Sequence, residues 1–498
     1  MAAPEKRQVV FLMTDTQRWD MLSCQGIPAM QTPCLDRLAA GGVRFERAYT
    51  CQPVCGPARA AIFTGQWPHA TGAWTNSAAL GDNVRTLGQR LQDLGLHTAY
   101  IGKWHLDGSD YFGLGRCPDG WDPAWWYDMR NYLDELTPEE RRKSRDSQLM
   151  EREHVPAEFT FGHRCSNRAI DFLKRHGGED FFLTVSYDEP HHPFLCPDEF
   201  MKMHRDTVLP DEPNLHDDLA GKPEHQHAWA GPALEREPAT RRQPRAFLAC
   251  NSFVDAEIGR VIEAVRRHAP DALILYTSDH GDMLGSHRLG GKGPAMYDEI
   301  TRVPMIANWP GRIPAGSVCP HPVSHIDLAP TILDCIGAVP EAPLNGRSMK
   351  PALLDPQFRP HDIVFMEFGR YEVDHDGFGG FQPVRCVFDG RHKLIINLLS
   401  SDELYDLQTD PGELVNLIAS PAHAPLRDTL HNGLLNWMNQ TRDPFRGYYW
   451  ERRPWRTDAA PATWNYTGMT RQREEPAYEP RQLDYATGLE ITAATRRK

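Results

Sequence analysis

This 498-residue chain lacks the features that mark a membrane protein, a disulfide-built scaffold or a nucleic-acid-binding protein. No apolar run approaches the roughly 20 residues that a membrane-spanning helix needs. The eleven cysteines are odd in number and scattered, without the spacing of a disulfide framework or a zinc site. The net charge of −13 argues against nucleic acid or an anionic membrane as a partner. We therefore expect a globular protein of a reducing compartment, most simply the cytoplasm.

The N-terminal segment also lacks the pattern of a removable signal peptide. Residues 1–7 lead directly into an apolar strand pattern at Gln8–Thr14. Asp15 directly follows this strand and is needed for the site described below, so we expect the segment to belong to the folded protein.

The length exceeds what one ordinary core supports, so we expect two domains and an extension. In residues 1–345, strand-like runs alternate with helical periodicity, which predicts an α/β catalytic domain with a mostly parallel sheet. Short strand patterns separated by Gly and Asp turns predict a small antiparallel domain with one helix over residues 346–442. Residues 443–498 are rich in Arg, Pro, Trp and Tyr and predict an extended arm. It would pack on the body or hold a homo-oligomer together.

The predicted elements place the polar motifs at strand ends. The predicted strands are Val9–Asp15, His97–Ile101, Phe181–Tyr187, Ala272–Ser278, Ile363–Glu367, Val384–Phe388, Lys393–Asn397 and Glu403–Leu407. The predicted helices are Thr32–Gly41, Thr86–Leu94, Asn167–Arg175, Ala246–His268, Ser324–Gly337 and Leu426–Met438.

The most informative segment is Cys51–Ile62, which contains Cys55-x-Pro57-x-Arg59. Pro57 fits the first turn of a helix, where its missing N–H costs nothing. Cys55 would then lie at a helix N-terminus, facing backbone N–H groups and the positive end of the dipole. Arg59 lies one turn further along the same face. The segment therefore predicts a site for a developing oxyanion or a bound sulfate.

Four predicted strands each end in polar groups suited to catalysis. Their carboxyl-terminal ends carry Asp15, Lys103-Trp-His105-Leu-Asp107, Asp188-Glu-Pro-His191 and Asp279-His280. In open α/β sheets, ligands bind at the carboxyl ends of the strands, so these groups are expected to meet in one site.

These motifs resemble those of the type I, formylglycine-dependent sulfatases of the alkaline phosphatase-like superfamily. Cys55-x-Pro57-x-Arg59, followed by Ala-Ala-Ile-Phe-Thr64-Gly65, resembles the formylglycine signature. Gly95–His105 resembles the family's second signature, and Pro190-His191-x-Pro193 resembles its histidine motif. Asp279-His280-Gly281 resembles the metal-binding pair late in the family's sequence, and Lys292 resembles its sulfate-contacting lysine. The likeness runs from residue 8 to about 440 and is strongest to a bacterial subgroup of uncertain substrate. It implies a mixed, mostly parallel sheet flanked by helices, with a smaller C-terminal antiparallel α+β domain. It also implies a maturation enzyme that oxidises Cys55 to formylglycine.

The resemblance implies a metal site formed by Asp15, Asp279, His280 and the modified Cys55. By analogy calcium is favoured, whereas the imidazole ligand leaves Mn²⁺ or Mg²⁺ open. Most sulfatases carry two adjacent acids where this chain has Asp15-Thr16. The Thr16 hydroxyl, the Gln17 amide or a water would fill that place.

The implied mechanism has two steps. A hydroxyl of the hydrated formylglycine at Cys55 attacks sulfur, and His191 protonates the departing alcohol with help from Lys292. His105 then takes the proton of the remaining hydroxyl and sulfate is expelled. Arg59, Lys103 and Lys292 neutralise the charge that develops on the sulfate oxygens.

The substrate is expected to be a small sulfate ester, such as that of a sulfated sugar or a related alcohol. Candidate residues for binding its alcohol part lie after His105, after the nucleophile helix and in the second domain. They are Asp107, Trp74, Asn76, Glu367, Arg370 and Arg385.

Three other functions remain open at this stage. A phosphonate monoester or phosphodiester hydrolase of the same superfamily shares the Cys-x-Pro-x-Arg nucleophile, but typically lacks the Lys-x-His seen at Lys103 and His105. A non-catalytic binding protein would need few of these residues. A thiolate nucleophile at Cys55 would not need a metal.

Overall fold

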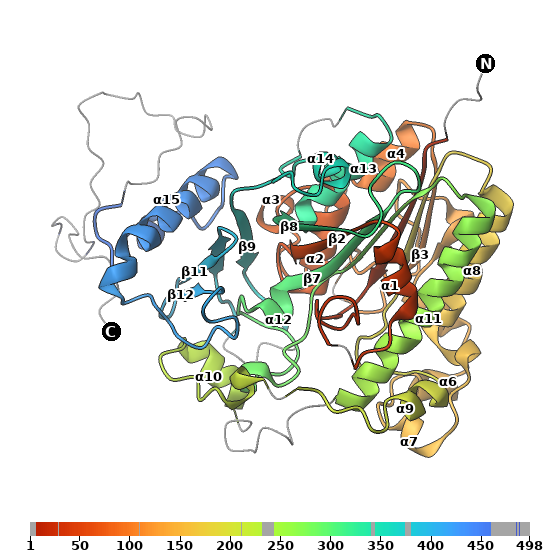
Figure 1. Cartoon of the computed structure of the whole chain (residues 1–498), viewed down its shortest axis with the longest axis horizontal. Helices are drawn as coiled ribbons and strands as arrows, with labels where there is room; N and C mark the ends of the chain where they lie inside the picture. The colour runs from red at the N-terminus through yellow and green to blue at the C-terminus, as the bar shows by residue number, and fades with distance from the viewer. Residues whose placement is uncertain are drawn as a thin grey trace.

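The computed structural model describes residues 6–27, 29–108, 110–210, 212–231, 244–339, 344–373, 380–459, 485 and 488. Two sheets organise these residues, a large sheet within residues 8–324 and a small one within residues 364–406 (Figure 1). No helix in the described part of the chain is long and apolar enough to cross a membrane. All eleven cysteines are free thiols.

The large sheet has eight strands in the order β4-β3-β5-β1-β6-β7-β2-β8. Strands β4, β3, β5, β1 and β6 run parallel, and β7 is antiparallel to both of its neighbours. Their bounds are β1 Gln8–Thr14, β2 Val43–Tyr49, β3 His97–Gly102, β4 Trp126–Tyr127, β5 Phe181–Ser186, β6 Leu273–Ser278, β7 Arg302–Asn308 and β8 Ser317–Ser324.

Helices cover both faces of this sheet (Figure 1). Successive side chains of a strand point to opposite faces, so the apolar side chains of the buried strands need a layer of helices on each face. Val9, Phe11 and Met13 of β1 join the core cluster beneath α2, α4, α13 and α14. Val10 and Leu12 join the cluster beneath α1, α8 and α11. The bounds of these helices are α1 Pro33–Ala40, α2 Cys55–Thr64, α4 Leu87–Asp93, α8 Phe161–His176, α11 Pro244–His268, α13 Leu328–Cys335 and α14 Lys350–Leu354.

Shorter helices lie in the connections: α3 Pro68–Thr71, α5 Met129–Asp134, α6 Pro138–Lys143, α7 Leu149–Arg152, α9 Asp198–Met203, α10 Glu224–Ala230, α12 Asp298–Thr301 and α16 Tyr448–Glu451.

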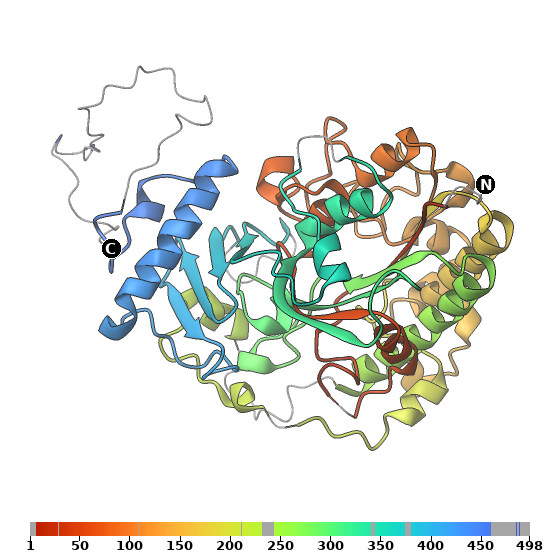
Figure 2. The same ribbon diagram turned by 45° about the horizontal axis from the view of Figure 1, so that its top comes forward.

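The small sheet is an antiparallel meander in the order β12-β11-β10-β9. Its strands are β9 Val364–Phe368, β10 Val384–Phe388, β11 His392–Asn397 and β12 Glu403–Asp406, and α15 Ala424–Gln440 covers one face (Figure 2). The described start of the C-terminal arm packs on this same unit. Asp443 pairs with Arg385 at 2.6 Å, Arg453 pairs with Asp402 at 2.8 Å, and Trp450 is buried. Most of the arm predicted over residues 443–498 lies outside the described residues.

The predicted fold class is confirmed: the large sheet is mixed and mostly parallel, and the second sheet is small and antiparallel. All eight predicted strands form, with ends shifted by a residue or less. Two helices differ from the prediction: α8 begins at Phe161, capped by Thr160, and the predicted helix Ser324–Gly337 is a 3-10 turn followed by α13. Strands β2, β4, β7 and β8 were not predicted. The domain limits at 345 and 442 stay predictions.

Candidate active site

Cys55 opens α2, a helix whose ten residues are all buried. The N–H of Gly56 donates to Asn76 Oδ1 at 2.8 Å, which satisfies one of the free backbone donors of the first turn. Three side chains meet the Cys55 sulfur: Lys292 Nζ at 2.8 Å, His280 Nε2 at 3.2 Å and Asp15 Oδ1 at 3.7 Å. These groups come from three separate segments of the chain, so the fold assembles a polar site around one thiol.

A metal-binding constellation surrounds the same sulfur. One ligand atom from each of Asp15, Cys55, Asp279 and His280 lies within 4.8 Å of the others, and all four residues are buried. Two carboxylates and an imidazole are donors that a hard or borderline divalent cation accepts. The residues present therefore fit the metal site that the sequence predicts.

Arg59 connects the two carboxylates of this constellation. Its Nε lies 3.1 Å from Asp279 Oδ2 and its Nη2 lies 3.0 Å from Asp15 Oδ2. Its Nη1 donates to the Lys103 carbonyl at 2.6 Å and to Ser186 Oγ at 2.8 Å. The side chain is fully buried, so in this arrangement its charge balances and positions the two acids. A contact of Arg59 with sulfate stays a prediction.

The residues after Asp15 take two different roles. The Thr16 hydroxyl donates to Asp15 Oδ1 at 2.6 Å, and the Thr16 N–H donates to Asp279 Oδ1 at 3.1 Å. The Gln17 amide is directed elsewhere, donating to Asn251 at 2.7 Å and accepting from Tyr276. Of the two candidates to replace the second acid, the structure therefore places Thr16 beside the constellation and removes Gln17 from it.

A second network joins Lys103 to His191. Lys103 Nζ lies 2.7 Å from Asp15 Oδ2 and 3.0 Å from Asp188 Oδ1. The Tyr111 hydroxyl donates to the same Asp188 oxygen at 2.5 Å and lies 3.0 Å from His191 Nδ1. His191 Nδ1 also lies 2.8 Å from the His192 carbonyl oxygen. This contact is a hydrogen bond if Nδ1 carries the proton and donates it to the carbonyl. This arrangement leaves Nε2 of His191 as the nitrogen available to a substrate.

Both catalytic histidines predicted from the sequence are neutral in the free site. Burial and the nearby charge of Lys103 lower the pKa of His105 to about 3 and that of His191 to about 3. His105 has a left-handed backbone, with φ of 58°, and its Nδ1 is buried without a hydrogen-bond partner among the described residues. A neutral, unpartnered imidazole nitrogen is suited to accepting a proton.

Opposing charges set the protonation of Cys55 and the acids. Burial and Asp15 would raise the pKa of Cys55, but Lys292, Lys103 and His280 outweigh them and lower it to about 7. Burial raises the pKa of Asp15, yet Lys103 leads a set of cations that hold it well below its ordinary value. Burial and the Asp15 charge raise the pKa of Asp279 to about 6. Two adjacent buried acids of this kind share a site best when a cation lies between them.

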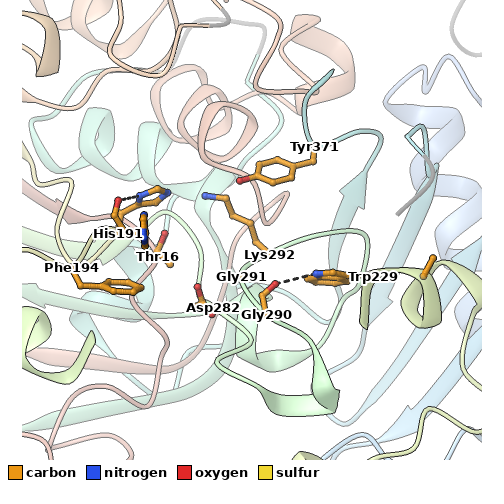
Figure 3. Close-up of a pocket in the computed structure, with 11 residues that line it drawn as sticks. Thr16, His191, Phe194, Trp229, Asp282, Gly290, Gly291, Lys292 and Tyr371 are labelled. Carbon is orange, nitrogen blue, oxygen red and sulfur yellow. Dashed lines mark hydrogen bonds between the residues drawn. The ribbon is translucent and has the colours of Figure 1, made fainter. Parts of the chain in front are cut away.

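A cavity of about 390 Å³ opens beside this centre. Lys292 and Tyr371 project into it from one side, and Thr16, His191 and Phe194 from the other, with Asp282 between them (Figure 3). Cys55, the cations and the acids thus lie next to a space for a small molecule.

Comparison with known proteins decides the family. The family model described as Sulfatase matches residues 7–338, and the one described as N-sulphoglucosamine sulphohydrolase, C-terminal, matches residues 285–440. The chain belongs to the sulfatase family. It is accordingly an enzyme, a sulfuric ester hydrolase.

Three similar proteins illustrate the range of this sulfatase's relatives. It is 45% identical to the uncharacterized sulfatase YidJ of Escherichia coli, with 96% of each chain covered. It is 26% identical to the N-acetylglucosamine-6-O-sulfatase of Bacteroides thetaiotaomicron, with 89% of each chain covered. The structure of a phosphonate monoester hydrolase of Agrobacterium radiobacter superposes with a TM-score of 0.73 at 23% identity, covering 88% of this chain and 96% of the other. The last likeness shows the fold alone.

Four of the suggested substrate residues lie in surroundings that leave their binding role a prediction. Asn76 holds the Gly56 N–H and donates to Glu372 at 3.3 Å. Asp107 accepts from the Leu114 N–H at 2.7 Å. Trp74 is half-buried and packs edge-on against two phenylalanines, and Arg370 is half-buried beside Tyr371.

The other two suggested substrate residues, both in the second domain, are buried and bonded to other residues. Arg385 is buried and bonds Asp443 with Nε at 2.6 Å and Nη2 at 3.0 Å, while Nη1 donates to two carbonyls. Glu367 is buried and accepts from the N–H of His69 at 2.8 Å and from its ring. The polar atoms of these two residues are bonded within the protein, where they join β9 and β10 to His69 and to the arm. A role of either residue in binding substrate stays a prediction.

Sequence reasoning missed Tyr111 altogether and gave Asp188 no role. Asp188 follows a buried strand, which was a usable signal. Tyr111 lies in an irregular stretch between β3 and β4 and carries no motif. Only the fold brings its ring to 4.1 Å from Lys103 Nζ and to 5.5 Å from the ring of His105.

Proposed function

We propose that this sulfatase hydrolyses the sulfate ester of a small alcohol through a formylglycine made from Cys55. The observation that carries the proposal is the approach of Lys292, His280 and Asp15 to one sulfur, at 2.8, 3.2 and 3.7 Å, at the N-terminus of a buried helix. A cysteine with only a structural role in the core would have apolar neighbours, and not the charged side chains that surround Cys55.

A formylglycine-generating maturation enzyme would oxidise the Cys55 thiol to the aldehyde. The hydrated aldehyde supplies a nucleophilic hydroxyl for sulfur, and its second hydroxyl allows sulfate to be expelled with return of the aldehyde. The side chain lies where α2 presents free backbone N–H groups and its positive dipole end, which favour negative charge.

The cations around Cys55 would neutralise the sulfate group. Lys292 is already directed at the position of the nucleophile, and Lys103 adds a second ammonium next to Asp15. A divalent cation would be held by Asp15, Asp279, His280 and the modified Cys55. When bound, this cation acts as a Lewis acid. Calcium is our choice by family analogy, with Mn²⁺ and Mg²⁺ as alternatives.

Two histidines would move the protons. The negative charge of a bound sulfate ester would raise the pKa of His191, so that Nε2 takes up a proton from solvent. His191 would then give this proton to the departing alcohol oxygen, assisted by Lys292. The Tyr111 hydroxyl and the Asp188 carboxylate lie behind its ring and would steady the imidazolium when it forms. His105, neutral and with an unpartnered nitrogen, would accept the proton of the remaining hydroxyl.

A sulfated sugar or a related small alcohol is the substrate class that we favour. The cavity of about 390 Å³ is of a size for a small molecule, and a relative over 89% of this chain is named an N-acetylglucosamine-6-O-sulfatase. The free cysteines support the cytoplasm as the compartment of action.

The first experiment is the mass of the peptide 48–59 from protein isolated from its own cells. A species about 18 Da lighter than the thiol form supports formylglycine. An unmodified thiol on every copy contradicts the mechanism and favours a thiolate nucleophile.

The second experiment separates the two superfamily activities. Sulfate esters and phosphonate monoesters with the same leaving group are compared on the matured enzyme. We expect kcat/KM to be higher on the sulfate, because Lys103 and His105 are both present. A higher value on the phosphonate would support the phosphonate hydrolase instead.

A further inference from the structure

The cavity beside Cys55 has walls of a distinct character. Three aromatic side chains, Phe194, Trp229 and Tyr371, line it together with Asp282 and Lys292 (Figure 3). His192 also belongs to the lining. Trp229 lies on α10, and its indole N–H donates to the Gly290 carbonyl at 3.1 Å. A Cβ added at Gly293 would lie 3.0 Å from the Trp229 ring, so the ring rests closely on this backbone. The aromatic walls therefore belong to an ordered surface.

Lys292 is the one Lys or Arg among the described residues that line this cavity, and it is already directed at the sulfur centre. Lys292 Nζ points to Cys55 Sγ at 2.8 Å and lies 5.7 Å from the centre of the Tyr371 ring. A sulfate at the nucleophile would engage this ammonium. Among the described residues, those that remain in the lining for the alcohol part of the substrate include no Lys or Arg.

Asp282 is the acid in this lining. Its Oδ1 accepts from the Leu284 N–H at 2.8 Å. Its other oxygen, Oδ2, has no hydrogen-bond partner among the described residues. The nearby guanidinium of Arg18 is engaged by Asp20 at 2.6 Å and by Glu212 at 3.6 Å. The Asp282 carboxylate thus contributes an acceptor oxygen and a negative charge to the cavity.

We propose that this cavity selects an uncharged, hydroxyl-bearing alcohol of sugar size, and that Asp282 excludes alcohols carrying a second anionic group. The aromatic faces pack on the C–H surfaces of such an alcohol, and Asp282 Oδ2 accepts from one of its hydroxyls. A second sulfate or a carboxylate would meet the Asp282 charge in a partly buried site, where the described lining offers no Lys or Arg besides Lys292. Such a contact between like charges is unfavourable. The inference rests on the proposed function, because it places the sulfate at Cys55.

The test uses two aryl sulfates that differ by one charge, a nitrophenyl sulfate with a carboxylate substituent and its carboxamide counterpart. We expect the wild-type enzyme to favour the carboxamide in kcat/KM by about tenfold. In Asp282→Asn, whose side-chain oxygen still accepts from Leu284, that ratio should fall several-fold toward one. The difference in reactivity between the two leaving groups is the same for every variant. A change in the ratio of the two kcat/KM values therefore reports on Asp282.

Glu212→Gln is the matched control, because Glu212 also lies near Arg18 but does not line the cavity. It should leave the ratio unchanged. Asp282→Ser, which keeps an oxygen for Leu284 without a charge, replaces Asp282→Asn if that variant does not fold.

Two results would overturn the proposal: a wild-type preference for the carboxylate substrate, or a ratio unaltered in both Asp282 variants. Failure of the proposed function looks different. In that case neither aryl sulfate would be cleaved while aryl phosphonates are, and the same ratio measured on a matched phosphonate pair would still test Asp282.

Discussion

Replacing Tyr111 with phenylalanine removes one hydroxyl from the network behind His191 and leaves the ring in place. The hydroxyl donates to Asp188 Oδ1 at 2.5 Å and lies 3.0 Å from His191 Nδ1. The ring, with Lys103 Nζ 4.1 Å from its centre, would be retained. The substitution therefore probes the support of His191 and not the packing of the site.

The expected loss follows from the interaction removed. A hydrogen bond to a charged group contributes about 1.5–3 kcal/mol. This contribution is needed when His191 carries and gives up its extra proton, because Tyr111 and Asp188 then stabilise the imidazolium. Since 1.4 kcal/mol corresponds to a factor of ten, kcat on alkyl sulfates should fall by about ten- to a hundredfold. Aryl sulfates with nitro-substituted leaving groups need little protonation, so they should lose much less.

The assay is kcat and KM over a series of sulfate esters whose leaving groups range from alkyl alcohols to nitrophenols. Tyr111→Phe should steepen the dependence of kcat on leaving-group pKa, and His191→Ala should steepen it further. Tyr132→Phe is the control, because its hydroxyl donates to the Phe159 carbonyl at 2.7 Å outside this network. An equal loss on alkyl and nitrophenyl sulfates would refute the reasoning, as would an undiminished rate on alkyl sulfates.

Two further predictions concern stability. Arg385→Met or Asp443→Asn should lower the free energy of unfolding in urea by about 3–5 kcal/mol, because each leaves one partner of a buried ion pair without the other. A raised KM without a loss of stability would instead mean that Arg385 contacts substrate. His431 is buried beside the Trp450 carbonyl, and burial lowers its pKa to about 3. Below pH 6.5 the unfolded chain therefore takes up a proton on His431 that the native protein does not. Stability should therefore fall as pH drops from 6.5 toward 3, and between pH 7 and pH 5 His431→Gln should lose about 2 kcal/mol less than the wild type. Equal losses in the two proteins would show that His431 is not the group responsible.

The strands that were predicted and those that were missed differ in a physical way. β1, β5 and β6 are mostly apolar, and β3 is buried from its second residue onward, as a parallel strand covered on both faces requires. β2 carries charged residues, and β7 and β8 contain prolines, which argue against a strand. β8 forms at an edge of the sheet, where a missing N–H is tolerated.

The sequence by itself located Cys55, the proposed nucleophile, and most of the residues proposed to act with it. Cys55, Asp15, Asp279-His280 and Lys103-x-His105 were found because each depends on local spacing: a helix start, or the end of a buried strand. Chemistry of this kind needs particular side chains at particular positions along the chain, so the pattern survives without a structure.

Only the tertiary structure decided which of the other polar residues serve the site. Arg385 and Asp443 are 58 positions apart, and His69 and Glu367 are 298 apart, yet each pair is bonded inside the protein. Tyr111 reaches His191 from 80 positions away. Such partners are chosen by the packing of distant segments against one another, and no local pattern records that choice.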